Sequence, residues 1–392
     1  MSKIVFFSIP AHGHTNPTLG VVRELVSRGH QVWYYSYNML RETIEAAGAI
    51  FISCDDYDTE QKLTAKDAAR IGKDLAFSAK VLVDTTLSLD DKVCAEMAAL
   101  QPDCIVADSM ALWGKAVALK LGIPFVSSTT TFAFNQHSAK VMQQGLGDLV
   151  KMLWSMPKTN RQVKRLQRKG YPVKTILDII GSDDSCHTIV YTSPEFQPYA
   201  ETFSDKYAFV GPSIRPARDT IEKTREKLAY ISMGTVNNDM LPFYKRCISA
   251  LQDTPYQVIL SVGNLVSPAE FGTLPEHISV FPHVDQMAVL QQADVFVSHC
   301  GMNSVNESLY FGVPLVMLPQ TAEQSGVAAR VAQLGAGILL GRNSSLPDAI
   351  QTLLEAPSYA QHAATLADGF RRCPGAKGAA DKILQVCEGG KG

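Results

Sequence analysis

The stretch from residue 295 to residue 324 constrains the fold of this chain more than any other. It opens with a short apolar run, 295–297, which is typical of a buried strand, and glycine and polar residues then break the pattern. The pattern next predicts a helix over 305–310, followed by a second apolar run at 313–318. Strand, glycine turn, helix and strand in this order predict one right-handed βαβ unit of a parallel sheet.

Polar side chains gather where the strands of this unit end. Asn303 and Ser304 are strong N-cap residues, and a helix that starts directly after a glycine turn offers N–H groups to phosphate oxygens. Glu307 follows one helical turn later and can accept hydrogen bonds from ribose hydroxyls. Glu323 and Gln324 fall beyond the next strand, at the carboxyl edge where open α/β sheets bind ligands. These polar positions at one edge favour a ligand site over an ordinary βαβ unit.

The N-terminal part of the chain shows the same rhythm of strands and helices. Apolar runs predict strands at 4–9, 31–36 and 50–54, with helices at 18–28 and 41–47 between them. This βαβαβ order predicts a Rossmann-like fold. The first turn has a single glycine and lacks the G-x-G-x-x-G pattern, so we expect no dinucleotide there.

That first turn, predicted as a loop over 10–17, carries two histidines at the end of the first strand. A later strand at 103–106 ends in Asp108, at the same predicted edge of the sheet. A carboxylate in this place can orient an imidazole and stabilise its cation, which favours a catalytic pair with His14. Without a partner, an exposed loop histidine is the commoner interpretation, and it stays open for His12.

Length and composition exclude several classes of protein. A chain of 392 residues can form two domains, each with its own core. The net charge of −2 gives no reason to expect nucleic acid or an anionic membrane, and no apolar run is long enough to span a bilayer. The chain starts directly with a strand, without a signal peptide, and its eight cysteines form no Cys-x-x-Cys pair. We therefore expect a cytoplasmic protein without a membrane anchor.

Two further segments have open interpretations. Asp56 and Asp58 form an Asp-x-Asp pattern that can hold a metal, but nothing around it completes a cation site, so we interpret it as a solvated loop. The segment 139–171 is predicted to be helical, basic and rich in methionine. Its charges are typical of one solvated helix face, whereas methionines such as Met152 can repack around apolar ligands.

The pattern divides the chain into four parts. We predict an N-terminal Rossmann-like domain over 1–210 and a second one over 227–370. The segment 211–226 combines proline, glycine and charged residues, which is typical of a linker between domains. The remaining residues, 371–392, are predicted to form a C-terminal helix.

Residues 281–331 resemble the donor-binding signature of UDP-sugar-dependent glycosyltransferases that modify small molecules. The whole chain resembles the bacterial branch that glycosylates macrolides, flavonoids and other phenols. The resemblance implies an α/β protein with two Rossmann-like domains facing each other across a cleft, the GT-B fold. The acceptor would lie on the first domain and the UDP-sugar on the second, and the last helix would return to the first domain. A nucleotide-sugar epimerase or binding protein is the alternative, but neither needs an apolar acceptor region or a histidine–aspartate pair.

The resemblance also implies a reaction and its residues. His14 of the Gly13-His14 motif would act as the base and Asp108 would support it, while His12 would at most contact donor or acceptor. A sugar, in the first place glucose, would pass with inversion to a hydroxyl of a small apolar acceptor and give a β-glycoside without a metal. The donor-binding positions implied are Gly13, Thr235, His283, Val284, Gln286, His299, Gly301, Met302, Asn303, Ser304, Glu307, Glu323 and Gln324.

Three positions depart from the family's signature. His283 stands where the family has a tryptophan that stacks on uracil, and Asp285 stands where proline precedes Gln286. Met302 replaces a common tryptophan after the His-Cys-Gly sequence. An imidazole can still stack on a base, but it selects the base less strongly than an indole. We therefore expect UDP-glucose as the main donor and some use of dTDP-glucose as well.

Overall fold

The computed structural model describes most of the chain as two compact α/β units. The described residues are 1–55, 74–135, 137, 146–175, 178, 186–235, 238–341 and 344–390, without the side chains of 75 and 146–156. Unit 1 comprises Met1–Tyr191, Tyr199–Ser213 and Pro374–Gly392, and unit 2 comprises Thr192–Pro198 and Ile214–Cys373. The predicted Asp56-x-Asp58 loop lies outside the described residues, and so does the side chain of Met152.

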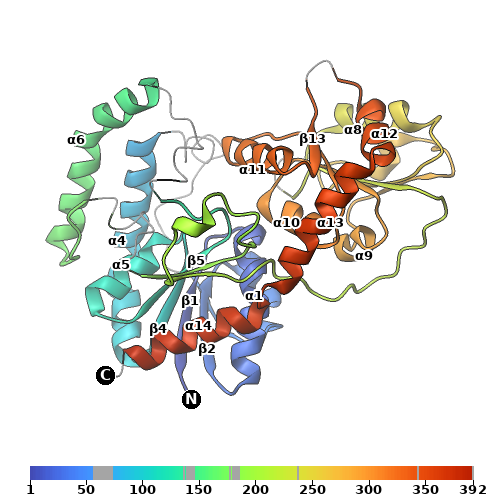
Figure 1. Ribbon diagram of the computed structural model, residues 1–392. Helices are drawn as coiled ribbons and strands as arrows, with labels where there is room; N and C mark the ends of the chain where they lie inside the picture. The colour runs from blue at the N-terminus through green and yellow to red at the C-terminus, as the bar shows by residue number, and fades with distance from the viewer. Residues whose placement is uncertain are drawn as a thin grey trace. The chain divides into compact units, whose positions relative to one another are not determined.

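Unit 1 is built on a seven-stranded parallel sheet with the order β3-β2-β1-β4-β5-β6-β7 (Figure 1). The order runs in one direction from β1 to β3 and in the other from β4 to β7, so it reverses between the neighbours β1 and β4. The strands are β1 (Lys3–Phe7), β2 (Gln31–Ser36), β3 (Ile50–Ser53), β4 (Cys104–Asp108), β5 (Phe125–Thr129), β6 (His187–Val190) and β7 (Tyr207–Phe209).

Helices cover both faces of this sheet, because the strand side chains alternate between two cores. Ile4 and Phe6 belong to a core with α1 and α14, whereas Val5 and Phe7 belong to a core with α4 and α5. Helix α6 packs against α4 in a further apolar cluster. The helices are α1 (His12–Ser27), α2 (Arg41–Glu45), α4 (Leu75–Leu100), α5 (Leu112–Leu121), α6 (Leu146–Arg168) and α14 (Gly375–Gly389).

The last helix, α14, completes unit 1 although it is the final element of the chain. Ile383 and Cys387 are buried in the same core as Ile4 and Phe6. At its start, Gly375 N donates to the carbonyl of Val210 at 2.8 Å. The described division differs from the predicted one in its bounds. Thr192–Pro198 group with unit 2, unit 1 continues to Ser213, and unit 2 resumes at Ile214, within the predicted linker 211–226.

Helix α1 begins earlier than the sequence pattern predicts. The residues 10–17 were expected to form a loop, but the helix starts at His12 and contains Pro17. The carbonyl of Ala11 accepts from the N–H groups of both His14 and Thr15 at 3.1 Å, which sets the first turn. Pro17 is the sixth residue of the helix and has no N–H, so the helix continues through it with one intrahelical bond fewer. As a result, His14 lies on a helix rather than on a loop.

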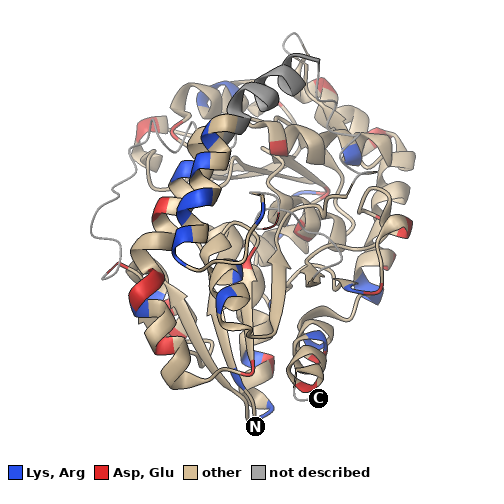
Figure 2. Cartoon of the chain, turned by 90° about the vertical axis from the view of Figure 1, so that its left-hand side faces the viewer, with Lys and Arg blue, Asp and Glu red and all other residues tan. Residues whose placement is uncertain are grey.

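Helix α6 has a basic, exposed face and an apolar, buried face. Lys158, Arg161 and Arg168 are exposed, and Figure 2 shows Lys and Arg side by side along this helix. Val163 and Leu166 are buried against the cluster shared with α4. Helix α6 is therefore amphipathic, with a basic face in solvent and an apolar face in the cluster. Within the described residues, no helix combines the length and the apolar composition that crossing a bilayer requires.

Unit 2 is built on a six-stranded parallel sheet with the order β10-β9-β8-β11-β12-β13, which reverses between β8 and β11. Helices α8 and α12 share one apolar core with these strands, and α10 packs against α9, α11 and α13. The strands are β8 (Leu228–Ser232), β9 (Gln257–Ser261), β10 (Ile278–Phe281), β11 (Val295–Ser298), β12 (Leu315–Met317) and β13 (Gly337–Leu339). The helices are α8 (Leu241–Leu251), α9 (Gln286–Leu290), α10 (Met302–Tyr310), α11 (Ala322–Gln333), α12 (Leu346–Glu355) and α13 (Pro357–Arg372).

Helix α5 packs closely on the sheet of unit 1 at Gly114, and this packing can be tested by substitution. A Cβ atom at Gly114 would lie 2.6 Å from the Cβ of Ala107 and 3.1 Å from Cδ2 of Phe7. Gly114→Ala should therefore lower the free energy of unfolding by about 1–3 kcal/mol, although alanine is the better helix former. Denaturant unfolding of the variant measures this change.

Gly326→Ala is the matched control, because nothing lies within 4 Å of a Cβ atom at that position of α11. The control should gain up to about 1 kcal/mol, the difference in helix propensity between the two residues. Equal gains from both substitutions would contradict the packing of α5 described above.

Candidate functional site

The first group of functional side chains lies where the strand order of unit 1 reverses. His14 is in the first turn of α1, which follows β1, and Asp108 is the last residue of β4. Nδ1 of His14 lies 2.8 Å from Oδ2 of Asp108, and the two side chains are 22% and 0% exposed. The predicted pairing of these residues is therefore present in the structure. The carboxyl ends of the strands at such a reversal are where open α/β sheets bind ligands.

The surroundings of Asp108 fix how it acts on the imidazole. Its other oxygen, Oδ1, accepts from the N–H of Met110 at 2.8 Å, so the carboxylate is held in place. A carboxylate accepts, and we therefore assign the Nδ1 proton of neutral His14 to the bond with Asp108. The lone pair then lies on Nε2, and the carboxylate stabilises the cation that forms when Nε2 takes a proton.

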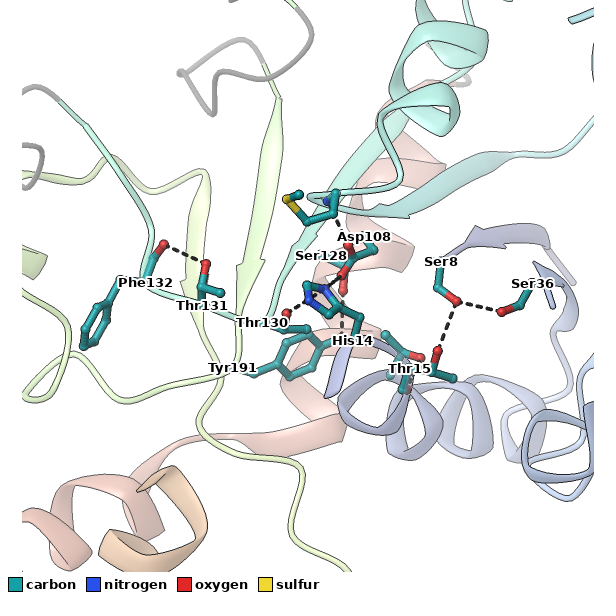
Figure 3. A network of polar contacts seen from close by, with 12 residues as sticks. Ser8, His14, Thr15, Ser36, Asp108, Ser128, Thr130, Thr131, Phe132 and Tyr191 are labelled. Carbon is teal, nitrogen blue, oxygen red and sulfur yellow. Dashed lines mark hydrogen bonds and ion pairs between the residues drawn. The ribbon is translucent and has the colours of Figure 1, made fainter. Parts of the chain in front are cut away.

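A third side chain, which sequence reasoning missed, completes this group. Oγ1 of Thr130 lies 3.1 Å from Nδ1 of His14 (Figure 3). Thr130 directly follows β5, the strand beside β4, and lies in a hydroxyl-rich stretch, 127–134. Its position at the carboxyl end of a neighbouring strand was the signal that could have identified it.

Hydrogen bonds between buried hydroxyl groups hold the start of α1 against the sheet. Ser8 Oγ bonds the hydroxyl of Thr15 at 3.1 Å and that of Ser36 at 3.0 Å (Figure 3). Thr18 bonds the hydroxyl of Tyr34 at 2.8 Å. Burial raises the pKa of Tyr34 to about 12, so this hydroxyl stays neutral. These bonds tie the first two turns of α1 to β1 and β2, and so fix the helix that carries the histidine.

The second group lies where the strand order of unit 2 reverses, after β8 and β11. His299 follows β11, and its ring lies between Gly234, which follows β8, and Gly301. A Cβ atom at Gly234 would lie 2.5 Å from Cε1 of His299, and one at Gly301 would lie 2.7 Å from Nε2. Gly234 also has a φ of +82°, which favours glycine. The imidazole is thus held in a cradle that only glycines can form.

Among the described residues no charged group shifts the pKa of His299, and burial keeps its ring neutral. Burial lowers its pKa to about 4, so the ring is uncharged near pH 7. Its Nδ1 is buried without a hydrogen-bond partner among the described residues. An uncharged imidazole with a polar atom unpaired can donate to a ligand oxygen without carrying a charge of its own.

Helix α10 begins at Met302, and this corrects the predicted N-cap. The N-cap is Gly301, without a side-chain cap bond, so Asn303 and Ser304 lie in the first turn instead. The reason is the preceding residue, because Cys300 has a left-handed φ of 67° and its N–H bonds the Ser298 hydroxyl at 3.1 Å. This turn delivers the chain directly into the helix. The first-turn N–H groups, which have no partner within an α-helix, therefore follow His299 in the chain.

Glu307 lies one turn further along α10 and is held by Gln286 of α9. Nε2 of Gln286 donates to Oε2 of Glu307 at 2.5 Å and lies 3.5 Å from the Ser304 hydroxyl. Oε1 of Gln286 accepts from the hydroxyl of Tyr230 at 3.1 Å. Burial raises the pKa of Glu307 to about 7, while the Gln286 bond acts in the opposite direction. The predicted ribose-binding residue is thus a positioned, partly buried carboxyl group.

The remaining predicted positions of unit 2 are more exposed. His283 is exposed, and its Nε2 lies 2.7 Å from Oδ1 of Asn264. Val284 is partly buried, and Thr235 is exposed directly after Gly234. In unit 1, Gly13 is an exposed residue that precedes His14 in α1.

Glu323 and Gln324 lie in the first turn of α11, after β12, and Gln324 has a structural role there. Oε1 of Gln324 accepts from the N–H groups of Gln320 at 2.7 Å and Thr321 at 3.2 Å, and Thr321 Oγ1 accepts from Gln324 N at 3.3 Å. This is a capping box, in which the helix start and the side chain stabilise each other. The bonds fix the direction of the Gln324 amide, whose Nε2 carries two further donors. Sequence reasoning did not foresee this second role.

Among the described residues, no group of three or more His, Cys, Asp and Glu side chains could hold a metal ion. The two polar groups instead combine imidazole, carboxyl, hydroxyl and backbone N–H groups. An imidazole paired with a carboxylate can take a proton from a hydroxyl, and backbone N–H and hydroxyl groups can bind phosphate oxygens.

Sequence comparison relates this chain to one protein family and to several bacterial relatives. A family described as the C-terminal domain of erythromycin biosynthesis protein CIII-like proteins matches residues 246–385. The UDP-glucosyltransferase YojK of Bacillus subtilis (strain 168), itself uncharacterised, is 32% identical over 98% of this chain and 98% of its own length. The demethyllactenocin mycarosyltransferase of Streptomyces fradiae is 30% identical over 86% of this chain and 75% of its own length.

Solved structures show the same fold over the whole chain. The crystal structure of the kitacinnamycin glycosyltransferase has a TM-score of 0.82 with 26% sequence identity. The match covers 98% of this chain and 98% of that one. The two parallel α/β units of this chain therefore have the fold of a glycosyltransferase.

The raised pKa of Glu307 makes a prediction for stability. A group whose pKa rises on folding stabilises the folded state below its unfolded pKa, and this contribution is lost as the pH rises through the folded value. Between pH 5 and pH 8, wild type should lose up to about 3 kcal/mol relative to Glu307→Gln, as expected for a shift from 4.5 to about 7. Denaturant unfolding of both proteins at several pH values measures the difference.

Glu276→Gln is the control, because Glu276 is exposed in the same unit. Its free energy of unfolding should run parallel to that of wild type over the same pH range. A difference between wild type and Glu307→Gln that stays constant from pH 5 to pH 8 would show that Glu307 is not in the described environment.

Proposed function

The chain belongs to the family of bacterial small-molecule glycosyltransferases of the GT-B type, and from this premise we propose the reaction of this UDP-glycosyltransferase. We propose that it transfers a sugar from UDP to a hydroxyl group of a small apolar acceptor with inversion at the anomeric carbon. Each unit carries one half of the reaction: unit 1 holds the acceptor and its base, and unit 2 holds the donor. The single observation that carries the proposal is the bond between His14 and buried Asp108.

His14 acts as the general base in this reaction. Its Nε2 takes the proton of the acceptor hydroxyl while that oxygen attacks the anomeric carbon. The bond between the anomeric carbon and the β-phosphate oxygen breaks, and its electron pair leaves with UDP. One displacement inverts the anomeric centre, so an α-linked donor gives a β-glycoside. Asp108 stabilises the imidazolium that forms, which supports this role for the pair.

The negative charge of the leaving UDP is met by fixed dipoles, and the proposal includes no metal ion. The N-terminus of α10 directs its first N–H groups at the phosphates, and the neutral ring of His299 adds a hydrogen bond. The hydroxyl groups of Thr235 and Ser304 add further donors. The unpaired Nδ1 in the glycine cradle of His299 supports a ligand at this place, because a buried polar atom without a partner is unfavourable.

UDP-glucose is the proposed donor. Glu307 accepts from the ribose hydroxyls, Glu323 and Gln324 bind the hydroxyls of the sugar, and His283 stacks on the base. A fully hydroxylated sugar fits this set better than a deoxysugar, which would leave a polar group unpaired at a cost of about 1–3 kcal/mol. Some use of dTDP-glucose is expected, because an imidazole selects the base less strongly than an indole.

The acceptor is proposed to be a natural product such as a macrolide or a flavonoid. The matching family model is named for erythromycin biosynthesis, and one relative is named as a demethyllactenocin mycarosyltransferase. Two exposed apolar side chains of unit 1 support an apolar acceptor. They lie in the segments that follow Asp108 and Thr130, the two residues that contact His14. Met110, two residues after Asp108, is 47% exposed, and Phe134, four residues after Thr130, is 38% exposed. An epimerase would have no use for these groups or for the His14–Asp108 pair.

The base assignment predicts the effect of two substitutions. His14→Ala should lower kcat on a phenol acceptor by roughly 10²–10⁴-fold, the value of general base catalysis, and leave UDP binding nearly unchanged. Asp108→Asn should lose less, because it removes the orienting charge but keeps the imidazole. Steady-state kinetics and calorimetric titration with UDP measure both effects.

Asp103→Asn is the matched control, since Asp103 precedes the same strand and binds Lys3 N at the opposite end, at 2.8 Å. It should keep near-normal turnover. Normal turnover of His14→Ala on the same phenol would exclude His14 as the base.

The donor assignment predicts how two substitutions of Gln324 differ. Gln324→Ala removes both the sugar contact and the capping box, whereas Gln324→Glu keeps the box, which glutamate also forms. Both should weaken the preference for UDP-glucose over a UDP-deoxysugar, but only Gln324→Ala should lose stability, by about 1 kcal/mol. Competition between the two donors, together with thermal unfolding, separates the effects.

Wild-type preference for the deoxysugar would contradict the proposed donor while leaving the transferase assignment intact. An unchanged donor preference in Gln324→Glu would confine Gln324 to its role in the capping box.

A further inference from the structure

A buried carboxylate beside the donor site has no role in the reaction described so far. Asp285 stands where the family's signature has proline, and its side chain is 3% exposed. Its oxygens accept from both terminal nitrogens of Arg215, at 2.6 and 3.1 Å, which is a bidentate ion pair. They also accept from the N–H groups of Arg218 at 2.5 Å and Asp219 at 3.3 Å.

The same carboxylate caps α9. Oδ1 of Asp285 accepts from the N–H of Met287 at 3.1 Å, and this makes Asp285 the N-cap of the helix. These bonds, with the Arg215 side-chain bond the strongest among them, lower the pKa of Asp285 to about 2 against the effect of burial, so the carboxylate is ionised at any working pH. Asp285 thus ties the segment that begins at Arg215 to the first turn of α9.

The residue directly after Asp285 contacts the proposed ribose site. Gln286 is the first residue of α9, and its amide lies between the hydroxyl of Tyr230 and the carboxyl of Glu307, at 3.1 and 2.5 Å. A helix of five residues has few bonds of its own, so its start depends on its cap. Loss of the bonds that hold Asp285 therefore changes the position of Gln286, and with it the position of the Glu307 carboxyl group that Gln286 binds.

We propose that Arg215 and Asp285 are positioning residues for the ribose of the donor, acting through Gln286 on Glu307. This inference rests on the function proposed above, because it assigns ribose recognition to Glu307. Arg215 also acts on Glu307 through its charge: burial raises the pKa of Glu307 to about 7, and the Arg215 charge lowers it. The Gln286 hydrogen bond and the Arg215 charge together favour an ionised Glu307 in a fixed place, which accepts hydrogen bonds from ribose.

Discrimination between ribose and deoxyribose tests this proposal without any transfer reaction. Calorimetric titration gives the ratio of Kd values for dUDP and UDP. A hydrogen bond to a charged group predicts a preference of wild type for UDP of roughly 10- to 100-fold. Arg215→Met should reduce this ratio at least threefold, raise the KM for UDP-glucose and leave kcat within about twofold.

Lys223→Met is the matched control, because Lys223 lies in the same segment and pairs with Asp294 at 2.6 Å without reaching α9. It should keep the wild-type ratio and KM. Asp285→Asn is a second test that keeps an N-cap residue but loses the charge, and it should reduce the ratio as Arg215→Met does. In the variant that combines Arg215→Met with Asp285→Asn, the two reductions of the Kd ratio should not add, because both substitutions break the same Arg215–Asp285 ion pair.

Two negative outcomes have different meanings. If wild type fails to bind UDP, the proposed donor site is wrong. If wild type binds UDP with a clear preference over dUDP, and folded Arg215→Met and Asp285→Asn keep that preference, the positioning role is wrong and the donor site stands.

Discussion

The reversal of strand order in each parallel sheet is the constraint on which both polar groups depend. Neighbouring strands at a reversal send their connections in opposite directions, so their carboxyl ends are left open to a ligand. In unit 1 these neighbours are β1 and β4; His14 lies on the helix that follows β1, and Asp108 is the last residue of β4. In unit 2 they are β8 and β11, and Gly234 and His299 lie in the segments that follow them. One rule of topology thus places two chemically different groups.

The two histidines show how local surroundings adapt one residue type to different tasks. His14 has a buried carboxylate at Nδ1, so a proton taken at Nε2 is stabilised. His299 lies between two glycines, and burial lowers its pKa to about 4. The first imidazole is suited to accept a proton, whereas the second is suited to remain a neutral hydrogen-bond donor. The difference between the two rings is therefore set by the residues around each histidine.

Much of the fold could be predicted because it follows from local patterns. Apolar runs place the strands, and the rule for carboxyl ends brings His14 and Asp108 together although they are far apart in sequence. Helix starts were predicted less well, because the bonds of the Ala11 carbonyl and the left-handed Cys300 outweighed the local signals of Pro17, Asn303 and Ser304. Thr130 and the Arg215–Asp285 pair depend on partners 116 and 70 residues away, which no periodicity encodes.

The stereochemistry of the product tests the central claim most directly. A base that activates the acceptor for one displacement requires the new glycosidic bond to be opposite in configuration to the bond in the donor. With UDP-α-glucose and a phenol acceptor, the anomeric coupling in the proton NMR spectrum of the isolated product should be that of a β-glucoside. An α-glucoside would mean retention of configuration and would contradict the role of His14 and Asp108.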